Sequence, residues 1–455
     1  MATYDAFQQT FCLSMLANRV WLDHGSQSAL QTQLQTELSY FLTVTDLESN
    51  LQTSWVPAMI GSWNVTWGPV VWQNAGSDVA DNALYVAYTA DFAGLGPTYV
   101  VAIAATNPMS DFDWLTEDFS VSQVVDFSSY TPLTTAPTAV PAAQIDDKTG
   151  TYISLGTATG IYKLLQMVGT VYDGPTPGKT SATLDAYLTG STIDSGATII
   201  FTGHSLAGAL SPTLALYLKE AGALSQFSAT NVYPTAGASP GNGNFASLFN
   251  TTFPQSAPNN VKGSEQYSKQ WNTLLWNQYD VVPHAWCTQA VSPNTALPSL
   301  DNVAALYTKG DKLAELLSIL CLVGKAKKGS TDSGITYTPL QNQWLPGQLF
   351  EGMFPVSADL SLPVYVPPLN LLGELLQLAY QHMTEYDAAG LMDIGAFSAQ
   401  AKTVQPALIS GVSKDDLDTM FKLIMGWSVS IGCGTSTVDA DAAQLQAAAA
   451  QPAGA

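Results

Sequence analysis

Basic residues are scarce in this chain. Lysine and arginine together number 15 against 36 aspartates and glutamates, the net charge is −21, and Arg19 is the only arginine. A surface that binds nucleic acid needs clusters of lysine and arginine to neutralise phosphates. Electrostatic docking to an anionic membrane needs them as well. The composition therefore argues against both partners, and any contact with a lipid interface would have to be apolar.

Long apolar runs and paired cysteines are also missing. No stretch of 18 consecutive apolar residues occurs, so no transmembrane helix is expected. The short apolar stretch 11–17 has no positively charged region before it, so no signal peptide is recognised. The four cysteines are widely spaced, without the pairing typical of metal sites; they are Cys12, Cys287, Cys321 and Cys433. One or two disulfides of a secreted protein and four buried thiols both remain open.

One serine lies between a short apolar run and a stretch with helical character. Residues 199–201 are Ile-Ile-Phe, and residues 203–209 are Gly-His-Ser-Leu-Ala-Gly-Ala. This strand–serine–helix order is typical of a nucleophile elbow. The sharp turn allows only small residues two positions either side of Ser205, and Gly203 and Ala207 meet this need. The turn exposes the serine hydroxyl and places the amide of Leu206 at a helix N-terminus, where it can stabilise an oxyanion.

A serine nucleophile needs a histidine base and a carboxylate that orients it. In the order Ser, Asp, His that accompanies this elbow, His284 and His382 are the two histidines that follow the serine with room for an acid before them. We favour His382, at the end of an apolar segment. The best acid is Asp280, because residues 272–279 resemble a buried strand and a carboxylate at its end faces the elbow's edge of the sheet.

These motifs resemble the class 3 lipases of the α/β-hydrolase superfamily. The family elbow is Gly-His-Ser-Leu-Gly-Gly-Ala, and Ala207 replaces one of its glycines. The family also carries an aspartate before Val/Ile-Val-Pro, as Asp280 stands before Val281-Val282-Pro283. The resemblance extends over residues 80–290 and the region near 382. It implies an α/β fold, namely an α/β-hydrolase with a mostly parallel central sheet flanked by helices, plus a lid and a helical insertion.

The second oxyanion donor follows from the resemblance. An apolar strand of the family ends in Arg-Gly-Ser/Thr with Asp/Asn-Trp shortly after, and here Ala104-Ala105-Thr106 precedes Asp113-Trp114. The match implies that the Thr106 amide assists that of Leu206. The family arginine is absent, so whatever it holds must be held differently.

Residues 107–150 occupy the place of the family's lid and are rich in Ser, Thr and Pro. A loop of this length is usually functional or disordered. Met109 and Trp114 could supply its apolar, substrate-binding side, and His204, beside the serine, is a further substrate-binding candidate. An ordinary surface loop is the alternative.

Residues 1–436 are interpreted as a single α/β-hydrolase domain. Helices are expected in residues 6–47 and antiparallel opening strands in 54–105. Residues 290–370 contain apolar helical stretches and predict a cap over an acyl pocket; a dimer interface or additional core is the alternative. Residues 437–455, rich in Ala and Gln, predict a disordered tail.

The sequence therefore predicts a triacylglycerol lipase or other carboxylic ester hydrolase with a Ser205–Asp280–His382 triad and an acyl-enzyme intermediate. A phospholipase A1, a feruloyl-type esterase and a polyester hydrolase would share this triad. An acyltransferase and a non-catalytic binding protein are the remaining alternatives. The chemistry needs no cofactor or metal, the expected partner is a lipid or other acyl ester, and no protein partner is identifiable. The family resemblance implies secretion; a cytoplasmic location is the alternative.

Overall fold

The computed structural model describes residues 4–21, 23–42, 59–107, 110, 113–118, 120–172, 179–257, 268–289, 297–303, 305–307, 317–357, 360–365 and 376–386. Its centre is a nine-stranded sheet in the order β13-β11-β9-β8-β3-β2-β1-β6-β7. The strands are β1 (Asn64–Trp72), β2 (Asn82–Thr89), β3 (Thr98–Ile103), β6 (Val168–Tyr172), β7 (Lys179–Thr183), β8 (Thr198–His204), β9 (Ala229–Thr235), β11 (Leu274–Asn277) and β13 (Asn342–Leu345).

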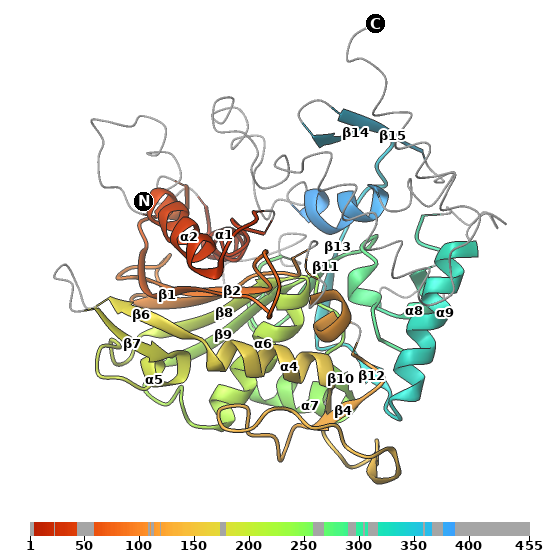
Figure 1. Ribbon diagram of the computed structural model, residues 1–455, viewed down its shortest axis with the longest axis horizontal. Coiled ribbons are helices and arrows are strands. Elements are labelled where there is room, and N and C mark those ends of the chain that lie inside the picture. The colour runs from red at the N-terminus through yellow and green to blue at the C-terminus, as the bar shows by residue number, and fades with distance from the viewer. Residues whose placement is uncertain are drawn as a thin grey trace, which may run out of the picture.

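The sheet is mixed. Strands β3, β8, β9, β11 and β13 run parallel to one another, and β2, β1, β6 and β7 continue the sheet with antiparallel pairs. Helices cover both faces (Figure 1). This arrangement is the α/β-hydrolase fold that the sequence predicts. The opening strands of residues 54–105 are confirmed as β1, β2 and β3, which pair antiparallel.

Two hydrophobic cores lie on the two faces of the sheet, because successive strand side chains point to opposite sides. On β2, Leu84 and Val86 belong to one core, whereas Tyr85 and Ala87 belong to the other. All seven residues of β8 are buried, as expected for a central parallel strand covered on both faces. The elbow strand is therefore held rigidly at the middle of the molecule.

The N-terminal helices lie on one face and the helices of the hydrolase core on the other (Figure 1). The first group confirms the helices expected in residues 6–47: α1 (Ala6–Leu16) and α2 (Gln27–Leu42). The second group comprises α4 (Leu155–Gln166), α5 (Leu184–Leu188), α6 (Leu206–Glu220) and α7 (Gly243–Thr252). Arg19 follows α1 and binds Glu37 of α2 at 2.9 Å, so the single arginine joins these two helices.

A smaller sheet combines strands from before and after the elbow in the sequence. It contains β12 (Tyr337–Thr338), β10 (Gly241–Asn242), β5 (Tyr152–Ser154) and β4 (Val124–Asp126). Within the predicted lid region 107–150 lie β4, the π-helical turn η1 (Asp113–Asp118) and the 3-10 turn η2 (Ala142–Gln144). The described part of this region therefore has regular structure close to the sheet.

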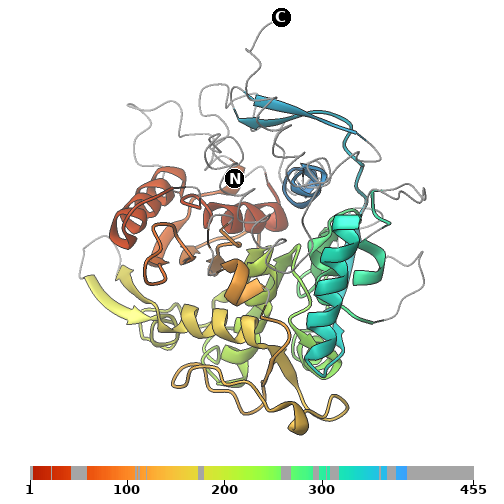
Figure 2. The same ribbon diagram turned by 45° about the vertical axis from the view of Figure 1, so that its right-hand side comes forward.

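The segment 290–370 combines helices with strands. Its helices are α8 (Leu300–Val303) and α9 (Leu317–Asp332), and its hairpin is β14 (Gly352–Ser357) with β15 (Leu360–Val364). Figure 2 shows α9, in blue-green, along one side of the molecule. Strand β13, from the same segment, pairs with β11 as the edge of the central sheet. Part of the predicted insertion is thus integral to the central sheet.

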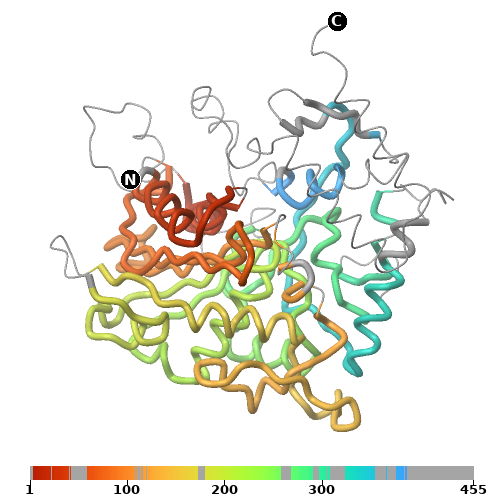
Figure 3. The backbone as a smooth tube through the Cα atoms, in the orientation of Figure 1, coloured from red at the N-terminus to blue at the C-terminus, as the bar shows by residue number. Residues whose placement is uncertain are grey.

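Residues 376–386 form the last described helix, which contains the π-helical turn η5 (Tyr380–Thr384). Figure 3 shows this segment near the N-terminal helices, although the two are far apart in the sequence. No helix in the described ranges is both long and apolar enough to cross a bilayer. The predicted tail 437–455 lies outside the described residues.

Candidate active site

Ser205 lies on a strained turn between β8 and α6. Its backbone has φ 60° and ψ −124°, a conformation that is costly for a residue with a Cβ. The turn is held by two hydrogen bonds, from the Ser205 N–H to the Thr235 carbonyl (3.0 Å) and from the Gly208 N–H to the Ser205 carbonyl (2.8 Å). This geometry places the serine at the N-terminus of α6, as the elbow pattern predicts.

The close packing of the elbow explains its small residues. A Cβ added to Gly203 would lie 2.4 Å from the Ala207 Cβ, and one added to Gly208 would lie 2.3 Å from the Thr235 carbonyl oxygen. The methyl group of Ala207 therefore fits because position 203 has none. The departure of Ala207 from the family pattern is accommodated without a change of the turn.

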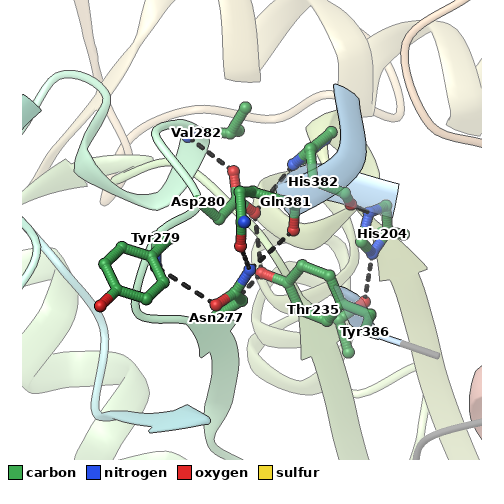
Figure 4. Close-up of polar contacts among 9 residues, drawn as sticks. All are labelled: His204, Thr235, Asn277, Tyr279, Asp280, Val282, Gln381, His382 and Tyr386. Atoms are coloured by element: carbon green, nitrogen blue, oxygen red, sulfur yellow. Dashed lines mark hydrogen bonds and ion pairs between the residues drawn. The ribbon is translucent and has the colours of Figure 1, made fainter. Parts of the chain in front are cut away.

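Asp280 and His382 are brought together from distant parts of the chain. The His382 Nδ1 lies 2.8 Å from the Asp280 Oδ2 (Figure 4), and the aspartate side chain is fully buried. Asp280 lies three residues beyond β11, which ends at Asn277, rather than directly at the end of the strand as expected. Its Oδ1 accepts the Val282 N–H at 3.0 Å. The carboxylate is thus fixed by its own turn and directed at the histidine.

The alternative histidine, His284, does not contact Asp280 through a hydrogen bond. Its Nδ1 lies near the Ser299 amide nitrogen (2.9 Å) and carbonyl oxygen (3.0 Å). Burial lowers its pKa to about 4, so this imidazole is neutral at pH 7. Of the two histidines that follow the serine, His382 is the one paired with the acid.

Tyr386 is a further partner of the acid that sequence analysis did not identify. Its hydroxyl donates to the Asp280 Oδ2 at 2.8 Å and accepts the Asn277 N–H at 2.9 Å (Figure 4). Burial, together with the charge of Asp280, raises the pKa of Tyr386 well above its usual value, which keeps the phenol protonated as a donor. The spacing of four residues from His382 on one helix is the signal that could have suggested it.

Buried amide side chains dock the helix that carries His382. The Asn277 Nδ2 donates to the Gln381 carbonyl (2.9 Å) and to its Oε1 (2.7 Å). Gln381 in turn donates to the Gln348 carbonyl at 2.7 Å, and the Gln348 N–H donates to Glu385 at 2.9 Å. Asn277, Gln381 and Glu385 are buried, so a bond lost by one of these side chains would leave a buried polar atom unsatisfied. The network therefore fixes the depth and rotation of the helix.

His204 joins three segments beside the serine. Its Nε2 lies 2.8 Å from the His382 carbonyl and its Nδ1 lies 2.8 Å from the Thr235 hydroxyl. Burial, and then the neighbouring His382, hold the pKa of His204 well below its usual value. The ring is neutral, so Nε2 carries the proton that the carbonyl accepts and Nδ1 accepts from the threonine. Both ring nitrogens are therefore bonded inside the protein, one of them to the backbone of His382, and the predicted substrate contact of His204 stays a prediction.

Thr106 follows β3 at the edge where the elbow lies. Its hydroxyl donates to the Asp118 carboxylate at 2.9 Å. Among the described residues, no acceptor takes the Thr106 N–H or the Leu206 N–H. Two backbone donors are therefore available for an anion, as an oxyanion hole requires. Met109 lies outside the described residues, as does the side chain of Trp114, so their predicted substrate contacts stay predictions.

Three carboxyl groups of η1 lie buried next to this loop. Burial raises the pKa of Glu117 to about 8 and that of Asp118 to about 7. Burial, followed by the nearby Glu117, also raises the pKa of Asp113 well above its usual value. Asp113 accepts the Asn107 N–H at 2.6 Å. The loop that contains Thr106 is therefore held in part by carboxyl groups that favour the protonated state.

We predict that Glu117→Gln weakens the pH dependence of stability. The pKa of Glu117 is about 8 in the folded protein against 4.5 for an unperturbed glutamate, so the folded state binds the extra proton between these values. The stabilising contribution is complete below about pH 4.5 and is lost as the pH rises through about 8. Thermal unfolding between pH 5 and 8 should show a decline of a few degrees in the melting temperature that is smaller in the variant.

The matched control for this measurement is Glu220→Gln. Glu220 is exposed at the end of α6, so its neutralisation should leave the wild-type decline intact. Parallel declines for Glu117→Gln and the wild type would contradict the assignment of a buried, protonated Glu117.

The cysteines and acidic residues show no metal centre in the described part of the chain. Cys12 and Cys287 are buried free thiols, and Cys433 lies outside the described residues, as does the side chain of Cys321. No group of three or more His, Cys, Asp or Glu side chains with the arrangement of a metal site occurs among the residues described.

Comparisons with known proteins agree with the sequence-based resemblance. Residues 144–289 match the family model "Lipase (class 3)". The crystal structure of M37 lipase is similar with a TM-score of 0.58 and 23% identity, covering 89% of this chain and 98% of that one. This level of identity supports the fold. No curated protein matches the chain.

Two further lipase structures align less well. Lip2 lipase from Yarrowia lipolytica gives a TM-score of 0.27 and 20% identity, with 45% of this chain and 56% of that one covered. A mutant of MDLA from Penicillium cyclopium gives 0.30 and 16%, with 65% and 83% covered. Scores this low carry no structural argument. The family match itself spans the serine elbow and Asp280, and over this segment it confirms the class 3 lipase resemblance.

Proposed function

We propose that this protein is a serine carboxylic ester hydrolase of the lipase type, with Ser205, His382 and Asp280 as its catalytic triad. The observation that carries the proposal is the buried Asp280–His382 hydrogen bond of 2.8 Å. A second hydrogen bond joins the His382 carbonyl to His204, and His204 directly precedes the strained serine. The class 3 lipase match supports an ester-hydrolysing activity.

The reaction begins when the Ser205 hydroxyl attacks the carbonyl carbon of an ester and His382 accepts the hydroxyl proton. Asp280 holds the imidazole through its Nδ1–H and stabilises the imidazolium that forms. The oxyanion of the tetrahedral intermediate binds to the N–H groups of Leu206 and Thr106, which donate to no other described residue. Collapse expels the alcohol, which takes the proton from His382, and leaves an acyl-enzyme.

Water completes the cycle by the same route. His382 removes a proton from a water molecule that attacks the acyl carbon, the second tetrahedral intermediate collapses, and Ser205 regains its proton as the acid leaves. The oxygen of Thr106 does not take part, because its hydroxyl is committed to Asp118. These steps use protein groups alone, without a cofactor.

The proposal includes a domain organisation. Residues 1–436 form one hydrolase domain in which 107–150 supply the lid, and the helical part of 290–370 caps the acyl site. Strand β13 is excluded from that cap because it belongs to the central sheet. The substrate is a lipid or other apolar acyl ester, in keeping with the acidic composition. Secretion remains a prediction.

The experiment that tests the proposal is hydrolysis of p-nitrophenyl esters from acetate to palmitate. We expect activity that increases toward long acyl chains and is lost in Ser205→Ala, because a lipase acyl site is lined by an apolar cap. Activity confined to short chains would retain the triad and identify an esterase instead. No hydrolysis at any chain length, together with no labelling by a fluorophosphonate probe, would contradict the proposal.

A further inference from the structure

The loop that contains Thr106 has no arginine, and hydrogen bonds to buried side chains hold it on both sides of Thr106. The residue that holds its first part is Asn18, in the turn that follows α1. The Asn18 side chain is buried, with 7% of its surface exposed, and its Oδ1 accepts the Ala105 N–H at 2.7 Å. This contact joins residues 87 positions apart in the sequence.

The hydrogen bonds of the loop leave one amide free at the right place. The Ala104 N–H donates to the Ala83 carbonyl at 2.9 Å, the Ala105 N–H to Asn18 at 2.7 Å, and the Asn107 N–H to Asp113 at 2.6 Å. The Thr106 N–H, between them, donates to no described residue. The amides on both sides of Thr106 are thus fixed by buried side chains, and its own N–H remains for a ligand.

We propose that Asn18 is a positioning residue for the oxyanion hole, and that the N-terminal helix α1 is thereby a working part of the active site. The proposal rests on the proposed function, since it assigns Asn18 a role in directing the Thr106 N–H. Asn18 does not touch the substrate. It acts by fixing the Ala104–Ala105 peptide, which directly precedes the Ala105–Thr106 peptide that carries the donor, and so limits the directions in which the Thr106 N–H can point.

The chemistry of the contact requires a carboxamide. While the Asn18 Oδ1 accepts from the loop, its Nδ2 lies 3.3 Å from the Ser14 carbonyl and 3.5 Å from the Met15 carbonyl. These two carbonyls lie in the last turn of α1 and also accept the backbone N–H groups of Ala17 and Asn18, at 3.2 and 3.1 Å, so the Asn18 amide adds a second donor at the end of the helix. Asn18 therefore binds the end of a helix with one side of its amide and the oxyanion loop with the other.

Helix α1 is a rigid support for this contact. The Tyr85 hydroxyl of β2 donates to the Leu13 carbonyl of α1 at 2.7 Å, and Phe7, Phe11 and Leu13 are buried in the core between the N-terminal helices and the sheet. The position of Asn18 is therefore coupled to the sheet that carries Ser205. Small displacements of catalytic donors cost large factors in rate, so a rigid support is needed.

The decisive variant is Asn18→Leu, which preserves the approximate size of the side chain but removes the acceptor. We expect kcat for a p-nitrophenyl ester to decrease by roughly 10–100-fold with KM changed by less than about twofold, because the oxyanion exists only after binding.

A thionoester of the same acid supplies a readout specific to the oxyanion hole. Sulfur is a weak hydrogen-bond acceptor, so the oxyanion hole stabilises the tetrahedral intermediate of a thionoester only slightly. The ratio of ester to thionoester turnover therefore measures how much the hole contributes to turnover of the ester. This ratio should decrease in Asn18→Leu. Asn18→Asp, which keeps an acceptor opposite the Ala105 N–H, should retain more of kcat and of the ratio than Asn18→Leu does.

The matched control is Thr10→Ala on the same helix. Thr10 is fully buried and its hydroxyl donates to the Ala6 carbonyl at 2.7 Å, so the variant disturbs α1 without touching Asn18 or the loop and should preserve the ratio. Equal losses in Thr10→Ala and Asn18→Leu, or an unchanged ratio in Asn18→Leu, would overturn the role of Asn18. If Asn18→Leu fails to fold, Asn18→Ala takes its place in the same comparison.

The failure of this proposal differs from the failure of the proposed function. If the wild type hydrolyses esters through Ser205 and Asn18→Leu has unchanged kinetics, only the proposed role of Asn18 is contradicted. Activity that survives Ser205→Ala overturns the proposed function and the role of Asn18 with it.

Discussion

Ser205→Ala is expected to abolish ester hydrolysis, with kcat lowered by roughly 10⁴–10⁶-fold. The substitution removes the nucleophile and leaves only the oxyanion donors and substrate binding to assist water. The fold should survive, because the Ser205 side chain makes no hydrogen bond that caps α6 and alanine retains the Cβ that the strained turn already accommodates. The loss is therefore chemical and not structural.

The measurement is turnover of a p-nitrophenyl ester beside thermal unfolding of the same samples. Ser211→Ala is a suitable control, because Ser211 lies in the same helix, is fully buried and has a hydroxyl without a hydrogen-bond partner among the described residues. That variant should retain turnover and fluorophosphonate labelling. A Ser205→Ala protein that hydrolyses esters at the wild-type rate would remove the serine from the mechanism.

The elbow was predictable because all its determinants are local. Gly203, Ser205 and Ala207 lie within five positions. A Cβ on residue 203 would lie only 2.4 Å from the Ala207 Cβ, so the steric reason for these small residues involves only neighbours in the sequence. The order Ser, Asp, His then reduced the candidates for the base to two. Chain order alone could not choose between them; in the structure His382 is the one that contacts Asp280, and its role as the base stays a prediction.

The supporting contacts were not predictable because they join distant segments. The Tyr386–Asp280 bond spans 106 positions and the Asn18–Ala105 bond spans 87, and apart from the four-residue spacing of Tyr386 from His382 no local pattern marks either pair. Strand β13 was missed for a related reason. Its four residues, Asn-Gln-Trp-Leu, lack the alternation or apolar run that identifies a strand, and pairing with β11 gives them their structure.

The end of strand β11 was predicted less accurately than the elbow, because its local sequence signal is weak. Asp280 was expected at a strand terminus, but β11 ends at Asn277 and a turn carries the acid. The side chain of Asn277 is used to dock Gln381, so the residue that ends the strand also positions the helix of His382. Such dual use of one residue depends on tertiary contacts that appear only in the folded chain.

Asp280→Asn is expected to lower kcat by roughly 10⁴-fold, as the same substitution does in other serine hydrolases. The Asp280 Oδ2 accepts from both His382 and Tyr386, each at 2.8 Å. An asparagine that presents its oxygen here cannot stabilise an imidazolium by charge. One that presents its amide opposes the Nδ1–H and favours the wrong tautomer. Either orientation prevents His382 from accepting the serine proton.

Tyr386→Phe separates the charge of the acid from its orientation. This variant removes one donor and leaves the Asp280–His382 bond in place, so kcat should decrease by only about tenfold, the scale of one charge-assisted hydrogen bond. The pair is measured as kcat and kcat/KM against pH, with folding confirmed by thermal unfolding. Comparable, small losses in Asp280→Asn and Tyr386→Phe would mean that the carboxylate only supports the helix. A large loss in Asp280→Asn alone would show that the reaction needs the negative charge of Asp280. Both variants disturb the same buried contact, but only Asp280→Asn removes the charge.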